Sequence, residues 1–424
     1  MTKMTVQAPW TKVSEPGGPE HDDGLRTVVR QAILDRMGRV HGYNLLFRTG
    51  GVALLQDERN EAARALIDDA MVFGLEQLTN GLPAFIPCTA ESVNEQWVNV
   101  LPAGMTVLHL HGSASPTPQL IAACQTLKTF GFRLALGSYC HDPAYAPLVE
   151  LADYIKVDFI GMDTASRAAL QKTAARVAAA LVAEKVETPE NYTQACAEGF
   201  GLFQGYYFCF PEMLKNHSVA ANQISLIRLL ELLNHQPMDL HEVAKCVKQD
   251  TSLTYRLLRL VNSPICAIRQ EVSSIESALM VVGEAMFRRI ATLAIATELN
   301  AHQPTEILRM GFVRGRFCEL AAGYSSLNPN EEYLLGMLSM LPAMLCVPMD
   351  ELTPGLPLRD EIRSALHGAA NRERCLLRWL EFHERADWTA CDAVARIHGL
   401  DRARLMLSYA EAVVWAEAAL HVVI

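Results

Sequence analysis

The chain has 424 residues, of which half are hydrophobic and 20% are charged, and its formal net charge is −10. This composition excludes an intrinsically disordered chain and is enough for two or three domains, each with its own core. Acidic side chains outnumber basic ones in residues 1–218 and again in residues 219–424, so we expect no nucleic-acid partner, because nonspecific phosphate binding needs clustered Lys and Arg.

The first 27 residues are polar and rich in Pro and Gly, which predicts a flexible tail. They lack the apolar core of a signal peptide, and no run of 18 apolar residues follows in the chain, so we expect no membrane span. The eleven cysteines form no CxxC pair, which favours free thiols in a reducing compartment. These patterns predict a soluble cytoplasmic protein of bacterial type.

Short apolar strands alternate with amphipathic helices over residues 28–212. A hairpin turn is predicted at residues 35–39, before the first clear strand. The predicted strands are 40–47, 84–87, 106–110, 133–137, 154–157, 178–184 and 202–205, and the predicted helices between them are 61–78, 119–130, 147–151, 167–177 and 190–198. This alternation predicts parallel strand pairing with crossover helices, and so an α/β sheet or barrel.

Helical periodicity replaces the strand pattern after a short linker at residues 213–222. Leucines recur at helical spacing in residues 226–233 and 253–261, and another apolar stripe, formed by Ala403, Leu407, Ala410 and Val414, marks a late helix. Breaks between helices are predicted at residues 262–264 and 327–329, where Pro follows Asn-Ser or Leu-Asn. We therefore expect an all-α domain over residues 223–424.

Four segments of the first half resemble the signature segments of EAL domains, the TIM-barrel-like phosphodiesterases that linearise cyclic di-GMP. They read YNLLFR at 43–48, YIKVD at 154–158, AEKVET at 183–188 and FQGYYF at 203–208. The resemblance covers residues 28–212, and residues 30–35 resemble the opening of the shorter EAL variant that is fused to a helical HDOD domain. It implies an EAL-type α/β barrel.

The resemblance also implies that the carboxylates of the two-metal site are lost. Asn44 stands at the metal-binding Glu of the family's name-giving motif, Pro87 at the Asn of the next strand, His109 at a Glu, and residues 137–138 (Gly-Ser) at an Asp pair. Two Mg²⁺ ions need several oxygen ligands. We therefore expect no metal, no cofactor and no catalytic residue. The positions that still match the family, and that we regard as a vestigial ligand-binding set, are Arg48, Lys156, Asp158, Glu184, Glu187 and Gln204.

Two alternatives remain for these side chains. Lys156 would serve either as a structural ion pair with Asp158 or Glu184, or as part of a ligand site. His109 and His111 point to the same face of their strand, and with residues 140–141 (Cys-His) they would form a soft-metal site, although a packed His pair is the commoner arrangement.

The second half resembles an HDOD domain, a helical relative of the HD phosphohydrolases. The segments that carry the resemblance are LIRLLELL at 226–233, DLHEVA at 239–244, LLRLVNS at 257–263 and IESAL at 275–279. Ser339 and Met340 occupy the place of the metal-binding His-Asp doublet, and the other histidines show no metal-ligand spacing. Neither Ser339 nor Met340 can replace the His-Asp doublet as metal ligands. The resemblance of the second half therefore implies binding and not catalytic turnover.

Four arginines near the best-matched helices offer a further candidate surface. Arg256, Arg259, Arg288 and Arg289 are interpreted as a solvated helix face, with an acidic partner or a nucleotide as the alternative.

Together these patterns predict a catalytically inactive EAL–HDOD regulatory protein of cyclic di-GMP-type signalling, which acts through protein–protein contacts of its HDOD domain. The alternatives are a cyclic di-GMP receptor and a phosphodiesterase with residual activity. Cyclic di-GMP binding is expected to be weak or absent, no membrane partner is expected, and homo-oligomerisation is left open.

Overall fold

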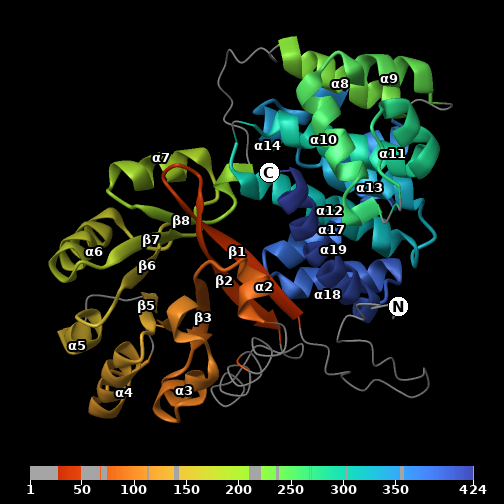
Figure 1. Cartoon of the computed structure of the whole chain (residues 1–424). Coiled ribbons are helices and arrows are strands. Elements are labelled where there is room, and N and C mark those ends of the chain that lie inside the picture. Colours follow the sequence, from red (N-terminus) through yellow and green to blue (C-terminus); the bar gives the residue numbers. More distant parts are fainter. Residues whose placement is uncertain are drawn as a thin grey trace, which may run out of the picture.

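The computed structural model has an α/β barrel in its first half and a helical unit in its second half (Figure 1). It describes residues 27–48, 67, 74–111, 114–137, 143–209, 221–234, 238–266, 268, 270–301, 303–353 and 358–423. The predicted N-terminal tail and most of the predicted helix at 61–78 and of the linker lie outside these residues. The predicted fold class, an α/β barrel followed by an all-α region, is confirmed.

The barrel is closed and follows the chain order of its eight strands. They are β1 (Thr27–Asp35), β2 (Val40–Arg48), β3 (Ala84–Cys88), β4 (Thr106–His111), β5 (Arg133–Gly137), β6 (Tyr154–Asp158), β7 (Ala180–Glu184) and β8 (Leu202–Gln204). All neighbouring pairs from β2 to β8 are parallel, as predicted. The pairing of β1 is antiparallel to both β2 and β8, which corrects the expectation of parallel pairing throughout.

The antiparallel β1 follows from the hairpin turn that joins it to β2. The Asp35 carboxylate accepts hydrogen bonds from the backbone amides of Met37 and Arg39 at 2.8 and 3.0 Å, which holds the turn. A turn this short reverses the chain, so the two strands must pair antiparallel. The sequence pattern predicted the turn but not the strand before it.

The helices around the barrel match the prediction except at their ends. Within the described residues they are α2 (Leu75–Thr79), α3 (Ala90–Asn94), α4 (Pro118–Thr129), α5 (Ala146–Val149), α6 (Thr164–Val177) and α7 (Pro189–Ala197). The predicted strand at 178–184 begins two residues late because Ala178 ends α6 in a left-handed conformation, and α3 was not predicted. Side chains of Thr117, Asp163 and Thr188 cap the helices that follow them.

Strand alternation divides the barrel residues into an outer set and a set that fills the lumen. An apolar cluster fills the lower lumen, and its members are Ile33, Phe85, Val107, Ala135, Tyr154, Val182 and Leu202. Two positions further along β3 to β8, and two positions earlier along the antiparallel β1, lies a layer at the carboxyl ends of the parallel strands, which Asn44 of β2 completes opposite Gln31. This mouth layer consists of Gln31, Asn44, Pro87, His109, Gly137, Lys156, Glu184 and Gln204.

The helical unit comprises twelve helices among the described residues. They are α8 (Ala221–Asn234), α9 (Leu240–Lys248), α10 (Thr251–Val261), α11 (Ile275–Leu299), α12 (Thr305–Ala322), α13 (Pro329–Leu338), α14 (Leu341–Leu345), α15 (Met349–Leu352), α16 (Asp360–Leu366), α17 (Arg374–Glu384), α18 (Trp388–His398) and α19 (Arg402–Val423). The breaks predicted at 262–264 and 327–329 are confirmed. The Asn262 side chain clamps the loop after the first break by pairing with the backbone of Val272.

Helix α12 lies at the centre of this unit, between α13 and α19. Gly336 permits the approach of α13, because a Cβ at this position would lie 2.3 Å from the carbonyl oxygen of Arg314. The predicted stripe of Ala403, Leu407, Ala410 and Val414 does lie on one helix, α19. It does not face the core: Leu407 and Val414 are 47% and 56% exposed, while the opposite side of α19 packs on α12.

One described helix, α19, has the length and the mean hydropathy (1.2) of a membrane span. Its packing on α12 within the helical core accounts for that apolar character equally well.

An ionic seam joins the two units along the outer face of β1 and β2 (Figure 1). The Arg30 guanidinium contacts the Glu417 carboxylate of α19 at 2.5 Å and lies over the Tyr43 ring, and the Tyr43 hydroxyl donates to Glu306 of α12 at 3.1 Å. Arg309 pairs with both Glu306 and Glu417. Burial opposes the charge of Arg30, but Glu417 and Tyr43 keep its pKa above the ordinary value.

Candidate functional site

Three of the six residues that the sequence singled out, Lys156, Glu184 and Gln204, belong to the mouth layer, and a fourth, Asp158, lies beside it. Lys156 and Asp158 end β6, Glu184 ends β7 and Gln204 ends β8. Glu187 is half-buried in the loop after β7. Arg48 ends β2, but its side chain lies outside the described residues, as do Ser138, Cys140 and His141.

A buried ammonium group occupies the mouth layer. The Lys156 side chain is fully buried, and its Nζ lies 2.7 Å from Glu184 Oε1 and donates to Asn44 Oδ1 at 3.0 Å. Burial lowers the pKa of Lys156, and the Glu184 carboxylate opposes that shift. Of the two ion pairs considered for Lys156, the one with Glu184 forms, while Asp158 pairs with Lys185; the ligand-binding role of Lys156 stays a prediction.

Asp158 is engaged elsewhere. Its Oδ2 accepts from Lys185 Nζ at 2.7 Å and its Oδ1 accepts from the Gly161 amide at 2.8 Å. Burial alone would raise the pKa of Asp158, but these donors lower it. Asp158 is therefore ionised at neutral pH and neutralised by an exposed lysine.

His109 fills the part of the mouth layer next to β5. Its ring is buried, and neither ring nitrogen has a hydrogen-bond partner within the described part of the chain. Burial, with the nearby charges of Lys156 and His111, holds the pKa of His109 well below its ordinary value, so the imidazole is neutral at pH 7. A Cβ on Gly137 would lie 2.2 Å from His109 Nε2, so the imidazole takes the space that a side chain on β5 would need.

The mouth layer does not fit a pair of divalent cations. At four positions where the resemblance implies metal ligands it presents an amide, a proline, an imidazole and a glycine, whereas a two-metal site needs several oxygen ligands. No group of three His, Cys, Asp or Glu side chains in the described ranges is arranged to hold a metal ion. The soft-metal site considered for His109 and His111 also needs residues 140–141, which lie outside the described residues, so it stays a prediction.

Gln204 and Gln31 connect the mouth layer to the helical unit. Gln204 Nε2 donates to Gln31 Oε1 at 2.8 Å, and Gln31 Nε2 donates to the main-chain oxygen of Glu384, the last residue of α17, at 3.3 Å. The Tyr206 hydroxyl donates to the same oxygen. Sequence analysis missed Gln31 because its strand was not predicted.

The helical unit contains a second buried ion pair, at the place of the HD doublet. Arg314 of α12 forms a bidentate pair with the Glu384 carboxylate, with distances of 3.0 and 2.7 Å, and its Nη1 donates to Ser339 Oγ at 3.1 Å. The Met340 side chain is buried in the core, as predicted. No local signal marked Arg314 and Glu384, because 70 residues separate them.

The four arginines proposed as an anionic-partner surface are largely engaged within their own unit. Arg256 pairs with Glu298, Arg288 with Glu284, and Arg289 with Glu319. Arg259 lies over the Tyr255 ring. The side chains of Arg256, Arg288 and Arg289 are only 13% to 27% exposed, and both the solvated helix face and the anion-binding surface stay predictions.

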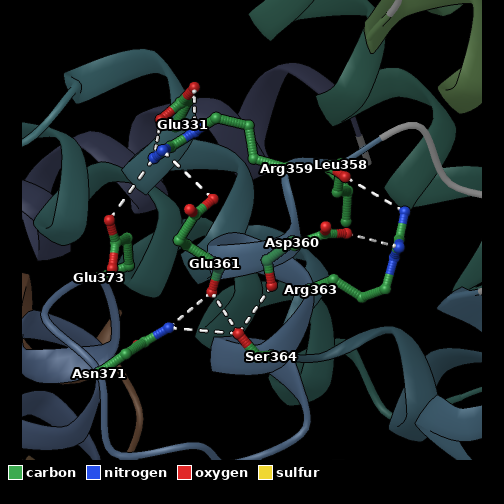
Figure 2. A network of polar contacts seen from close by, with 9 residues as sticks. All are labelled: Glu331, Leu358, Arg359, Asp360, Glu361, Arg363, Ser364, Asn371 and Glu373. Atoms are coloured by element: carbon green, nitrogen blue, oxygen red, sulfur yellow. Dashed lines mark hydrogen bonds and ion pairs between the residues drawn. The ribbon is translucent and has the colours of Figure 1, made fainter.

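A third polar network ties α13, α16 and the start of α17 together (Figure 2). The Arg359 guanidinium binds the Glu331 carboxylate at 2.8 to 3.1 Å and lies 3.4 and 3.6 Å from oxygens of Glu361 and Glu373. The neighbouring Glu332 is buried. Burial, with Glu373 and Glu331, raises its pKa to about 8, although Arg359 opposes the shift.

Comparison with known proteins identifies part of the helical unit. The HDOD domain family model matches residues 223–352, so this part of the chain is an HDOD domain. The chain is 29% identical over 397 residues to the cyclic di-GMP phosphodiesterase CdgJ of Vibrio cholerae, covering 92% of each chain. It is also 29% identical over 399 residues to YuxH of Bacillus subtilis, covering 92% of this chain and 97% of that one.

Solved structures resemble the barrel half. The phosphodiesterase PaMucR in complex with c-di-GMP aligns with a TM-score of 0.38 and 15% identity over 43% of this chain and 94% of that one. BlrP1 of Klebsiella pneumoniae, a calcium and cyclic di-GMP complex, aligns with a TM-score of 0.37 and 21% identity over 45% and 57% of the two chains. A barrel followed by an HDOD domain is the order of units that the sequence resemblance implied.

Proposed function

We propose that this chain is a catalytically inactive EAL–HDOD regulatory protein of cyclic di-GMP-type signalling, which acts through protein–protein contacts. The observation that carries the proposal is the mouth layer itself, in which Asn44, Pro87, His109 and Gly137 stand at positions that the resemblance assigns to metal ligands. None of these residues supplies the carboxylate that a two-metal hydrolase needs for its cations. The relative CdgJ is named a phosphodiesterase, which keeps residual activity as the competing function.

The deciding experiment incubates the full chain with cyclic di-GMP and Mg²⁺ or Mn²⁺ and follows the linear dinucleotide by chromatography. The matched control is Glu184→Gln, which removes the carboxylate that pairs with Lys156. We expect the same background rate for both proteins. Turnover well above background in the wild type that is lost in Glu184→Gln would overturn the proposal.

A second candidate is a cyclic di-GMP receptor that binds without turnover, because Arg48, Lys156 and Glu187 are retained. Titration calorimetry with and without divalent metal distinguishes this receptor from a scaffold that does not bind the nucleotide. A dissociation constant above roughly 100 μM, a binding free energy weaker than about −5.5 kcal/mol, supports the scaffold. Tighter binding that Arg48→Ala weakens and Arg39→Ala does not would establish the receptor, since Arg39 lies in the β1–β2 turn at the other end of the barrel.

The outward stripe of α19 supports protein contacts of the helical domain. Leu407 and Val414 lie seven residues apart on the exposed side of this helix, and Ile397 of α18 is 75% exposed. Contiguous exposed apolar surface marks protein-contact sites, and we propose this side of α19 as such a site. Cross-linking in the host cells identifies the proteins that contact the wild type. The double variant Leu407→Glu/Val414→Glu should lose these cross-links. The control Met37→Glu, which changes an exposed apolar residue of the barrel, should keep them. Retention of all partners by the double variant would place the contact elsewhere.

A further inference from the structure

We propose that the Gln204–Gln31–Glu384–Arg314–Ser339 chain couples the barrel mouth to the centre of the helical domain. The inference deepens the proposed function, on which it rests, because it names the route by which a non-catalytic barrel regulates the output domain. Gln204 belongs to the mouth layer, and Ser339 stands at the place of the HD doublet. This series of hydrogen bonds therefore joins the two sites at which the resemblance implies that metal ligands are lost.

Each link of the chain is a direct hydrogen bond or ion pair. Gln204 Nε2 donates to Gln31 Oε1 at 2.8 Å, and Gln31 Nε2 donates to the Glu384 main-chain oxygen at 3.3 Å. The Glu384 carboxylate binds Arg314 at 2.7 and 3.0 Å, and Arg314 donates to Ser339 Oγ at 3.1 Å. No water or mobile group is needed between the barrel and Ser339.

Because its members are buried, this series of hydrogen bonds responds when any one member loses its partner. Gln204, Glu384, Arg314 and Ser339 are buried or nearly so, and a buried polar group that loses its partner is costly. A shift of Gln204 therefore moves Gln31, and Gln31 moves the end of α17, where the Glu384 carboxylate fixes Arg314. The groups that form these links are all bonded, while Gln204 Oε1 is buried without a partner in the described part of the chain, so few arrangements satisfy the series and a change at one end favours a new arrangement at the other.

The chain also begins beside the residues that a ligand at the mouth would touch. Gln31 lies opposite Asn44 in the β1–β2 register, and Asn44 accepts a hydrogen bond from Lys156. Any group that binds in the mouth layer must displace or reorient one of these side chains. Gln31 is thus the one residue that lies between Glu384 of the helical domain and Asn44 of the mouth layer.

The test uses hydrogen-exchange mass spectrometry on the full chain without ligand. Gln31→Glu keeps an oxygen that accepts from Gln204 but cannot donate to Glu384, so it cuts the chain at one link. We expect amides of residues 336–340 and 381–386 to exchange at least threefold faster in Gln31→Glu. The matched control, Asp158→Asn, changes another mouth residue that is bound to Lys185, and it should leave those peptides unchanged. Unchanged exchange in Gln31→Glu, or an equal change in both variants, would overturn the coupling.

A second arm adds cyclic di-GMP at 200 μM as the probe. Where the nucleotide protects the barrel peptides, exchange at 336–340 must change in the wild type and stay constant in Gln31→Glu. Protection of the barrel with no change in the helical peptides contradicts the coupling. The ligand-free arm does not depend on nucleotide binding or on catalysis, so failure of the coupling and failure of the proposed function give different results.

Discussion

The imidazole of His109 occupies the space that a side chain at Gly137 would need. A Cβ on Gly137 would stand 2.2 Å from His109 Nε2, and the two residues lie on the paired strands β4 and β5, offset by two positions in the register. The resemblance places a Glu at the first position and an Asp pair at the second. In this chain the two residues are therefore linked by packing, because the His109 ring in its observed position leaves no room for a Cβ at Gly137.

Gly137→Ala should destabilise the protein by about 2 kcal/mol, since overpacking a tight core typically costs 1–3 kcal/mol. His109→Ala removes the obstructing ring, so the double variant His109→Ala/Gly137→Ala should be more stable than the sum of the single effects by at least about 1 kcal/mol. Urea denaturation of the four proteins measures this coupling. Additive effects would show that His109 and Gly137 do not exclude each other.

Lys156→Met should destabilise the barrel by roughly 3 kcal/mol, because it leaves Glu184 charged and without its partner in a buried site. The double variant Lys156→Met/Glu184→Gln removes both charges and should recover more than half of that loss. Unfolding followed by circular dichroism at pH 7 measures both. A double variant as unstable as Lys156→Met would argue against the ion pair as the cause.

Arg30→Met should weaken the seam between the units by roughly 3 kcal/mol, because it leaves Glu417 with only Arg309 in a buried setting. Calorimetry should then resolve two unfolding transitions in place of one. The control is Arg39→Met, whose exposed ion pair with Asp35 contributes less than about 1 kcal/mol and lies within the barrel. A single transition for Arg30→Met at an unchanged midpoint would contradict the role of the seam.

Glu332 should make the stability of the helical domain fall with rising pH. Its carboxyl keeps its proton in the folded state up to a pKa of about 8, whereas in the unfolded chain it loses the proton near 4.5. Between these values the unfolded state binds fewer protons than the folded one, so the free energy of unfolding decreases as pH rises, and above pH 8 the loss is complete. The titratable groups that interact with Glu332 are Glu331, Glu373, Arg359, Cys318 and Cys375.

Glu332→Gln removes this titration and should be more stable than the wild type by roughly 2 kcal/mol at pH 8, with little difference at pH 4.5. Urea denaturation at pH 4.5, 6 and 8 provides the comparison. Glu284→Gln, which removes the exposed partner of Arg288 and is not among the groups that shift the pKa of Glu332, should keep the wild-type slope with pH. Parallel curves for Glu332→Gln and the wild type would contradict the assignment.

Much of the fold followed from local patterns. Alternating strands and helices, the Asp35 turn and the proline breaks each depend on a few neighbouring residues, and the structure confirms them. Antiparallel β1 could not be predicted from alternation, because its pairing with β8 depends on closure of the whole barrel. The outward direction of the α19 stripe also depends on which side α12 covers, and the periodicity of one helix does not contain that information.

The candidate site also has features that the sequence determined and features that only the tertiary structure determined. The sequence by itself determined which chemical groups stand at the carboxyl ends of the strands, because strand periodicity and the quoted motifs place Asn44, His109 and Lys156 there. Only the tertiary structure decided their partners: Lys156 takes Glu184 while Asp158 takes Lys185, and Gln31 reaches Glu384 some 353 residues away. Such choices depend on distances of a few tenths of an ångström between elements that are remote in the chain, and these are fixed only when barrel and helices pack together.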